Sequence, residues 1–172
     1  MSDIILAGPK HSGKTSAGRA LASLSTCDFI DLDELISQRT GKTPRQLFSE
    51  SPEIFQKAEA EAMAAIAGSG AGRRVIAAGG GIIDNADAVL ILKNSGATIV
   101  CLKLSADCVW ERISAGGDLP PFLKTETPRE THRALHERRA AAYLQIANIV
   151  IETEGKTPEE IAGEIIELYG NC

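Results

Sequence analysis

Cysteine and histidine are scarce in this sequence, and neither is spaced for a metal site. The 4 cysteines include no C-x-x-C pair, and the 3 histidines are scattered along the chain. Such spacing fits neither a zinc site nor a disulfide framework. We therefore expect reduced thiols, which are the usual state in a cytosolic protein.

Long apolar runs and an excess of positive charge are also missing. No stretch approaches the ~20 apolar residues that span a membrane. The segment from Met1 to Gly8 lacks the basic start and long apolar stretch of a signal peptide. The chain has 18 Lys and Arg against 23 Asp and Glu, which disfavours duplex nucleic acid because phosphates need a basic face. We expect a cytoplasmic monomer without nucleic-acid or membrane partners.

The apolar residues that are present, 44% of 172, suffice for the core of one globular domain. Short apolar runs alternate with longer helical patterns, which is typical of an α/β fold. The runs are continuous rather than alternating, which indicates a parallel sheet covered on both faces. Strands are predicted at residues 4–7, 28–31, 75–78, 97–104 and 148–152.

Three Thr-Pro pairs mark predicted helix starts. Thr43, Thr127 and Thr157 each precede a proline and have Gln or Glu three residues later, the pattern of a capping box. The second of these helices, 128–147, carries several arginines and two histidines, and we expect a solvated basic face there. Trp110, in an amphipathic helix, is expected to be a packing residue.

The segment Gly8-Pro9-Lys10-His11-Ser12-Gly13-Lys14-Thr15 matches G-x-x-x-x-G-K-[ST] between a strand and a helix. In such a loop, backbone N–H groups and the N-terminus of the next helix bind phosphate. Lys14 is expected to reach the β- and γ-phosphates, and Thr15 offers a hydroxyl to Mg²⁺. The motif predicts a site for ATP or GTP and leaves the second substrate open.

Two carboxylates, Asp31 and Asp33, follow the second predicted strand at its C-terminal end, where open α/β sheets bind ligands. In an extended segment they share a face, so one can assist Mg²⁺ and the other can bind a substrate hydroxyl. In the alternative interpretation, Asp31 simply caps the next helix. The glycines Gly79–Gly81 end the third strand at the same edge, which permits a ligand's close approach or a tight turn.

These features, in this order, resemble the shikimate kinase family over nearly the whole chain. The segment from Phe55 to Glu59 is similar to the family's F-R-x-x-E, and Arg139 to Tyr143 is similar to its R-x-P-x-Y. The resemblance implies a P-loop kinase of the nucleoside monophosphate kinase-like fold. That fold is a three-layer α/β/α single domain, here residues 1–172, with a five-stranded parallel sheet in the order 2-3-1-4-5. It also implies a substrate-binding helical region at 33–62 and a mobile lid at 113–128.

Together, the motif and the resemblance predict a set of site residues. The predicted catalytic residues are Lys14, Asp31 and Asp33, and the predicted Mg²⁺ ligands are Thr15 and Asp31. The residues predicted to bind ATP are Gly8, Pro9, Lys10, His11, Ser12, Gly13, Lys14, Thr15, Ser16 and Arg112. The residues predicted to bind the acceptor are Asp33, Gln56, Gly79, Gly80, Gly81 and Arg139.

Three positions depart from the family's pattern. Gln56 stands where the family has an arginine that helps to hold the substrate carboxylate, and an amide cannot form the charged two-pronged pair. Leu119 replaces the lid arginine that meets the transferring phosphate, and Lys124 is the nearby candidate to replace it. His11 occupies a position where the family usually has glycine.

The sequence thus predicts an ATP-dependent small-molecule kinase that uses Mg²⁺ and phosphorylates the 3-hydroxyl of shikimate, a polyhydroxy acid. Lys14 would stabilise the transferring phosphoryl group and Asp33 would orient the acceptor hydroxyl. Two alternatives stay open. The loss of an arginine at Gln56 would suit a kinase of another polyol or sugar acid, and Leu119 in the lid would suit a poorly catalytic nucleotide-binding regulator.

Overall fold

The computed structural model describes residues 2–69, 72, 74–116, 119 and 123–169. Within them, the strands are β1 (Ile4–Ala7), β2 (Asp28–Asp31), β3 (Arg74–Ala77), β4 (Thr98–Lys103) and β5 (Ile149–Glu152). The first helices are α1 (Lys14–Ser25), α2 (Leu32–Thr40), α3 (Pro44–Glu50) and α4 (Pro52–Gly68). They are followed by a 3-10 turn η1 (Ile82–Asp84), α5 (Ala86–Asn94), α6 (Ala106–Ala115), α7 (Pro128–Ile146) and α8 (Pro158–Tyr169). All five strand predictions are confirmed to within one residue at each end.

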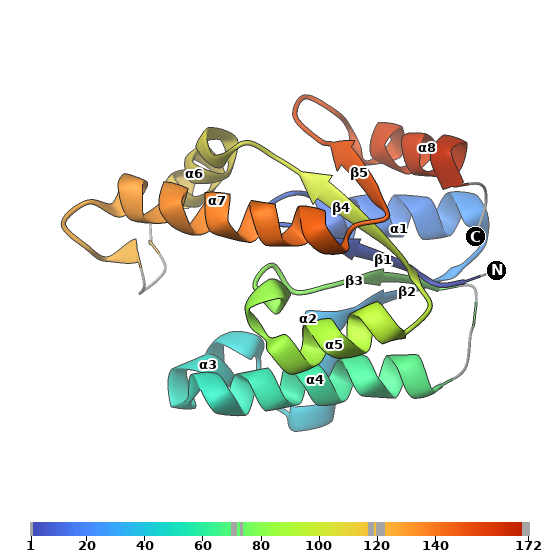
Figure 1. Ribbon diagram of the computed structural model, residues 1–172, viewed down its shortest axis with the longest axis horizontal. Coiled ribbons are helices and arrows are strands. Elements are labelled where there is room, and N and C mark those ends of the chain that lie inside the picture. The colour runs from blue at the N-terminus through green and yellow to red at the C-terminus, as the bar shows by residue number, and fades with distance from the viewer. Residues whose placement is uncertain (1, 70–71, 73, 117–118, 120–122, 170–172) are drawn as a thin grey trace.

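The described strands form one parallel sheet in the order β2-β3-β1-β4-β5, as the resemblance implies. In Figure 1 the strands point to one side, on which α3, α6 and the N-terminal half of α7 project beyond the sheet. Because the strands are parallel, the segments that follow β1, β2 and β3 leave the sheet at this same edge.

Helices cover both faces of the sheet, giving three layers. Strand β1 shows the division: Ile4 and Leu6 pack into a cluster with α1 and α8, whereas Ile5 and Ala7 pack into a cluster with α2, α4 and α5. All four side chains are at most 1% exposed. The strand is therefore apolar at every position because helices cover both faces of the sheet, as expected.

Two of the three predicted capping boxes form. Thr43 and Gln46 exchange hydrogen bonds between side chain and backbone, and so do Thr157 and Glu160. The prediction for Thr127 is wrong, although α7 does begin at the next residue, a proline. The backbone of Thr127 has φ −127° and ψ 69°, and its side chain makes no hydrogen bond that caps the helix.

The prediction of a solvated basic face on α7 is confirmed for Arg129, Arg133 and Arg138, which are exposed, and is wrong for the two histidines. His132 and His136 are only 6% and 9% exposed, and their ring centroids lie 5.8 Å apart. Trp110 of α6 packs against His132 at 5.6 Å between centroids, so Trp110 is a packing residue, as expected. Burial lowers the pKa of both histidines, which favours the neutral rings that an interface between α6 and α7 requires.

Candidate active site

The turn between β1 and α1 has the backbone that its glycines predict. Gly8 and Gly13 have φ values of 137° and 90°, which residues other than glycine rarely adopt. A β-carbon on Gly8 would also lie 2.4 Å from the carbonyl oxygen of Leu102, so the loop passes directly over the end of β4. His11 adopts φ 64°, in the left-handed region. This geometry explains why a glycine suits that position.

Lys14 is buried inside this loop. Its Nζ donates hydrogen bonds to the carbonyl oxygens of Gly8 at 3.0 Å and Pro9 at 2.7 Å. Burial lowers the pKa of Lys14 to about 8, against the opposing effect of Asp33 and Asp31. Helix α1 has neither a side-chain cap nor an acidic residue in its first turn. Its N-terminal N–H groups and this ammonium are thus arranged to receive phosphate.

Asp31 caps α2, as the alternative interpretation holds, and the same side chain also contacts the phosphate loop. Its Oδ1 accepts hydrogen bonds from the backbone N–H groups of Asp33 and Glu34, which caps α2. Its Oδ2 accepts a hydrogen bond from Thr15 Oγ1 at 2.8 Å. A hydroxyl and a carboxylate side by side at the mouth of a phosphate loop are hard oxygen ligands of the kind that Mg²⁺ prefers. The residues present therefore fit a magnesium ion and a nucleotide.

Asp33 lies in the first turn of α2 and faces the glycine triplet. A β-carbon on Gly79 would lie 3.4 Å from Asp33 Oδ1. Burial raises the pKa of Asp33, as does the charge of Asp31, while Lys14 and Lys10 lower it. A carboxylate of raised pKa is a better proton acceptor than an ordinary surface aspartate.

Glycines Gly79 and Gly80 are required by close contacts. A β-carbon on Gly79 would stand 2.8 Å from Glu59 Oε1, and one on Gly80 would stand 2.8 Å from the backbone nitrogen of Lys10. The triplet thus brings the end of β3 against the phosphate loop on one side and against α4 on the other.

Glu59 of α4 lies against the glycine triplet, and the sequence analysis did not select it as a functional group. It is 1% exposed, and its Oε2 accepts a hydrogen bond from Asn85 Nδ2 at 2.9 Å. Its Oε1 has no hydrogen-bond partner among the described residues. Burial raises the pKa of Glu59 to about 7, although the bond from Asn85 opposes this. The available signal was an acid on the face of α4 that otherwise carries apolar core residues.

Arg139 and Tyr143, four residues apart on α7, both lie against the glycine triplet. Tyr143 is fully buried, and its hydroxyl donates to the carbonyl oxygen of Gly80 at 3.1 Å. A β-carbon on Gly81 would lie 3.4 Å from Arg139 Nη2. Arg139 also binds Asp84 of η1, which sequence analysis did not select.

The remaining predicted residues lie around this centre. Arg112 of α6 donates to the carbonyl oxygen of His11, and Ser16 Oγ donates to the carbonyl oxygen of Gly13 at 3.1 Å. Ser12 is buried in the loop. The side chain of Gln56 is exposed, while its carbonyl oxygen accepts a hydrogen bond from Asn85 Nδ2 at 2.8 Å.

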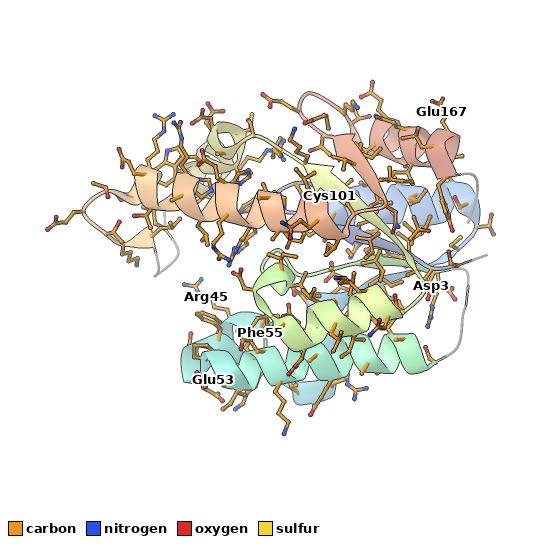
Figure 2. All side chains as sticks on the ribbon, in the orientation of Figure 1. Asp3, Arg45, Glu53, Phe55, Cys101 and Glu167 are labelled. Carbon is orange, nitrogen blue, oxygen red and sulfur yellow. The ribbon has the colours of Figure 1, made fainter. Side chains whose placement is uncertain are left out.

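The helical pair α3 and α4 forms one wall next to Gln56. Phe48 of α3 meets Phe55 of α4 edge to face, with ring centroids 6.0 Å apart. Arg45, one turn before Phe48, extends from α3 to the side on which α7 lies (Figure 2). Arg45 is thus a further cation in the region of 33–62, and no sequence motif indicated it.

Part of the predicted lid lies outside the described residues, namely 117–118 and 120–122. Leu119 is described, and it packs partly buried against a cluster of Leu104, Val109, Ile113 and Leu123. At this position the side chain has a packing role. In the part of the chain that the structure describes, no helix has the length and apolar character to cross a membrane.

Comparisons with known proteins agree with this geometry. The family model described as shikimate kinase matches residues 10–169. A shikimate kinase of Thermodesulfovibrio yellowstonii is 36% identical over 170 residues, which cover 98% of this chain and 95% of that protein. One from Marinomonas is 34% identical, covering 96% of this chain and 90% of its own length.

Solved structures give the same answer. The shikimate kinase of Acinetobacter baumannii in complex with shikimate superposes with a TM-score of 0.85 at 30% identity, covering 98% of this chain and 92% of that one. The Aquifex aeolicus shikimate kinase gives 0.77 at 29% identity, covering 98% and 97%. By its fold, its phosphate loop and these matches, the chain belongs to the shikimate kinase family.

Proposed function

We propose that this protein is an ATP-dependent shikimate kinase, which transfers the γ-phosphoryl group of ATP to the 3-hydroxyl of shikimate. The observation that carries the proposal is the meeting of a phosphate loop with two acids at one sheet edge: Lys14 and Thr15 lie beside Asp31 and Asp33. The family relationship supports the same activity. Neither the geometry nor the comparisons favour another acceptor or a non-catalytic role.

The nucleotide phosphates would bind in the loop of residues 8–16, against its N–H groups and those of α1. Lys14 would leave its two carbonyl partners and bind the β- and γ-phosphates. Thr15 and Asp31 would hold Mg²⁺, which neutralises phosphate charge when bound. Arg112, which donates a hydrogen bond to the carbonyl oxygen of His11 in the loop, would lie beside the nucleotide.

The acceptor would lie between Asp33 and the triplet Gly79–Gly81. Asp33 would accept a hydrogen bond from the 3-hydroxyl, orient its oxygen toward the γ-phosphorus and receive its proton as the new P–O bond forms and ADP leaves. Positioning and charge stabilisation carry most of phosphoryl-transfer catalysis. Arg139, over Gly81, would bind the substrate carboxylate.

The chain is proposed to work as one kinase domain over residues 1–172. Residues 33–62 would supply the substrate-binding wall, and residues 113–128 would form the lid that excludes water. The cytoplasmic location, the monomeric state and the absence of nucleic-acid and membrane partners stay predictions from the sequence. Gel filtration with light scattering tests the monomer.

An ADP-release assay with MgATP tests the function. Saturable turnover with shikimate, and none with a panel of other polyols and sugar acids, is the expected result. Turnover of another acceptor alone would overturn the assigned substrate. ATP binding without turnover of any acceptor would overturn the assignment as an enzyme.

A further inference from the structure

A carboxylate from η1 holds two neighbouring arginines of α7 at the rim of the acceptor site. Asp84 Oδ2 accepts a hydrogen bond from Arg139 Nε at 2.8 Å and forms an ion pair with Arg139 Nη2 at 2.7 Å. Asp84 Oδ1 accepts a hydrogen bond from Arg138 Nη1 at 2.7 Å. Burial alone would raise the pKa of Asp84, but the two guanidinium groups outweigh it and lower the pKa. Figure 1 shows η1 directly beside α7.

The geometry of these bonds leaves one edge of Arg139 open. A guanidinium presents five N–H groups in a planar fork. Asp84 occupies the edge formed by Nε and Nη2, with a hydrogen bond from Nε and an ion-pair contact to Nη2. The other edge, formed by Nη1 and the second hydrogen of Nη2, binds no described residue. That edge lies over Gly81, whose lack of a β-carbon leaves room beside Nη2.

The open edge has the shape that recognises a carboxylate. Two parallel N–H groups match the two oxygens of a carboxylate in a bidentate pair. Because Gln56 carries no charge, Arg139 is the one cation among the residues predicted to bind the acceptor. The orientation of Arg139 then decides how well the acceptor binds.

Arg138 determines the net charge of the group formed with Asp84 and Arg139. Asp84 alone would cancel the charge of Arg139 and remove its attraction for an anion. With Arg138 included, the three side chains carry a net charge of +1. The Arg138 side chain is 59% exposed, compared with 24% for Arg139, so Arg138 supplies charge from the solvent side while Arg139 faces the site.

We propose that Asp84 is a positioning residue that presents the open edge of Arg139 to the carboxylate of the acceptor, and that Arg138 keeps this cluster cationic. The proposal rests on the proposed shikimate kinase function. It assigns no contact between Asp84 and the substrate, and it adds Asp84 and Arg138 to the determinants of acceptor specificity.

The first test is Asp84→Asn, which keeps the shape and removes the charge that locks Arg139. The KM for shikimate should rise about tenfold, the equivalent of about 1.4 kcal/mol, while kcat and the KM for ATP stay within a factor of about two. An unchanged KM for shikimate would overturn the proposal. A lower KM would also overturn it, since Asp84 would then be a competitor of the substrate carboxylate.

A double-variant cycle separates positioning from a general structural effect. In an Arg139→Gln background, Asp84→Asn should change the KM for shikimate no further, because Asp84 acts through Arg139. An undiminished effect in that background would contradict the proposal. The carboxamide analogue of shikimate lacks the negative charge, so wild type and Asp84→Asn should bind it equally in calorimetry. A tenfold difference in affinity for this analogue would also contradict the proposal.

Arg138→Gln should raise the KM for shikimate more at low than at high ionic strength. The matched control is Arg133→Gln, on the same helix, where Arg133 pairs with the exposed Asp107 at 2.9 Å. An equal effect of the two variants would refute the assigned role of Arg138.

If the wild-type protein does not phosphorylate shikimate at all, the proposed function fails. If it does phosphorylate shikimate and Asp84→Asn behaves like wild type, only this inference fails.

Discussion

Thr15 and Asp31 are joined by a hydrogen bond of 2.8 Å between Oγ1 and Oδ2. Thr15 belongs to the first turn of α1, and Asp31 caps α2 with its other oxygen. One carboxylate therefore ties the phosphate loop to the segment that carries Asp33. The two predicted magnesium ligands are thus hydrogen-bonded to each other.

Substitutions at Asp31 should separate its two roles. Asparagine caps helices about as well as aspartate, whereas alanine costs about 1 kcal/mol, so Asp31→Ala should lower the free energy of unfolding and Asp31→Asn should not. Both should raise the Mg²⁺ concentration needed for half-maximal activity, because a charged oxygen ligand is lost. Urea unfolding and a magnesium titration measure the two effects. A wild-type magnesium requirement in Asp31→Asn would refute the role at the metal.

Lys14 should take up a proton when ATP binds. Because burial lowers its pKa to about 8, about half of the free protein carries an uncharged amine at pH 8. Phosphate favours the charged form, so about half a proton should be absorbed per ATP at pH 8, and little from this group at pH 6.5.

Titration calorimetry in two buffers of different ionisation enthalpy measures this uptake. The control is Lys14→Arg, whose guanidinium stays charged throughout and should show no uptake from this position at pH 8. Equal uptake by the two proteins would show that the proton enters elsewhere.

Glu59 should make the folded protein less stable as the pH rises. Its pKa is raised to about 7 from an ordinary 4.5, so between these values the folded state holds a proton that the unfolded chain has released. The free energy of unfolding should therefore fall between pH 4.5 and 7, by an amount on the order of 2–3 kcal/mol. Glu59→Gln should remove this dependence.

Urea unfolding of both proteins at pH 5 and pH 8 checks the sign. The wild type should lose more stability than Glu59→Gln over this interval. An equal change in the free energy of unfolding of the two proteins would mean that Glu59 is ionised in the folded protein near pH 5.

Gln56→Arg should improve the binding of shikimate. The new guanidinium would lie one turn from the buried Glu59 and beside the acceptor site. A charge-assisted hydrogen bond contributes about 1.5 kcal/mol, so the KM for shikimate should fall about tenfold. Lys57→Gln is the control, since Lys57 is 78% exposed and pairs only loosely with Glu61 at 3.9 Å. An unchanged or higher KM in Gln56→Arg would remove this explanation of the departure.

The sheet and the phosphate loop were predictable because each rests on local rules. Continuous apolar runs identify strands that are buried on both faces, and Gly8 and Gly13 mark the turns that the loop needs. Thr127 shows where local rules fail. Its sequence is a capping box, but its backbone angles, set by the irregular segment before α7, do not permit the bonds.

Site residues could be predicted where they directly follow a strand of the sheet. They could not be predicted where the packing of other elements brings them to the site. Asp31 and Asp33 follow a strand, so the parallel sheet brings them to the loop. Glu59 and Asp84 reach the site only through the packing of α4 and η1 against the glycine triplet. No pattern in the sequence indicates that Asp84 meets two arginines more than fifty residues away.

The identity of the product formed from ATP and shikimate, followed by ³¹P NMR, tests most directly whether Asp33 and the phosphate loop transfer phosphate to the 3-hydroxyl. We expect a phosphomonoester at the 3-hydroxyl, one ADP per ester, and a rate at least about 100-fold lower in Asp33→Asn with unchanged binding of MgATP. An ester at another hydroxyl, or an Asp33→Asn enzyme as fast as wild type, would contradict this expectation.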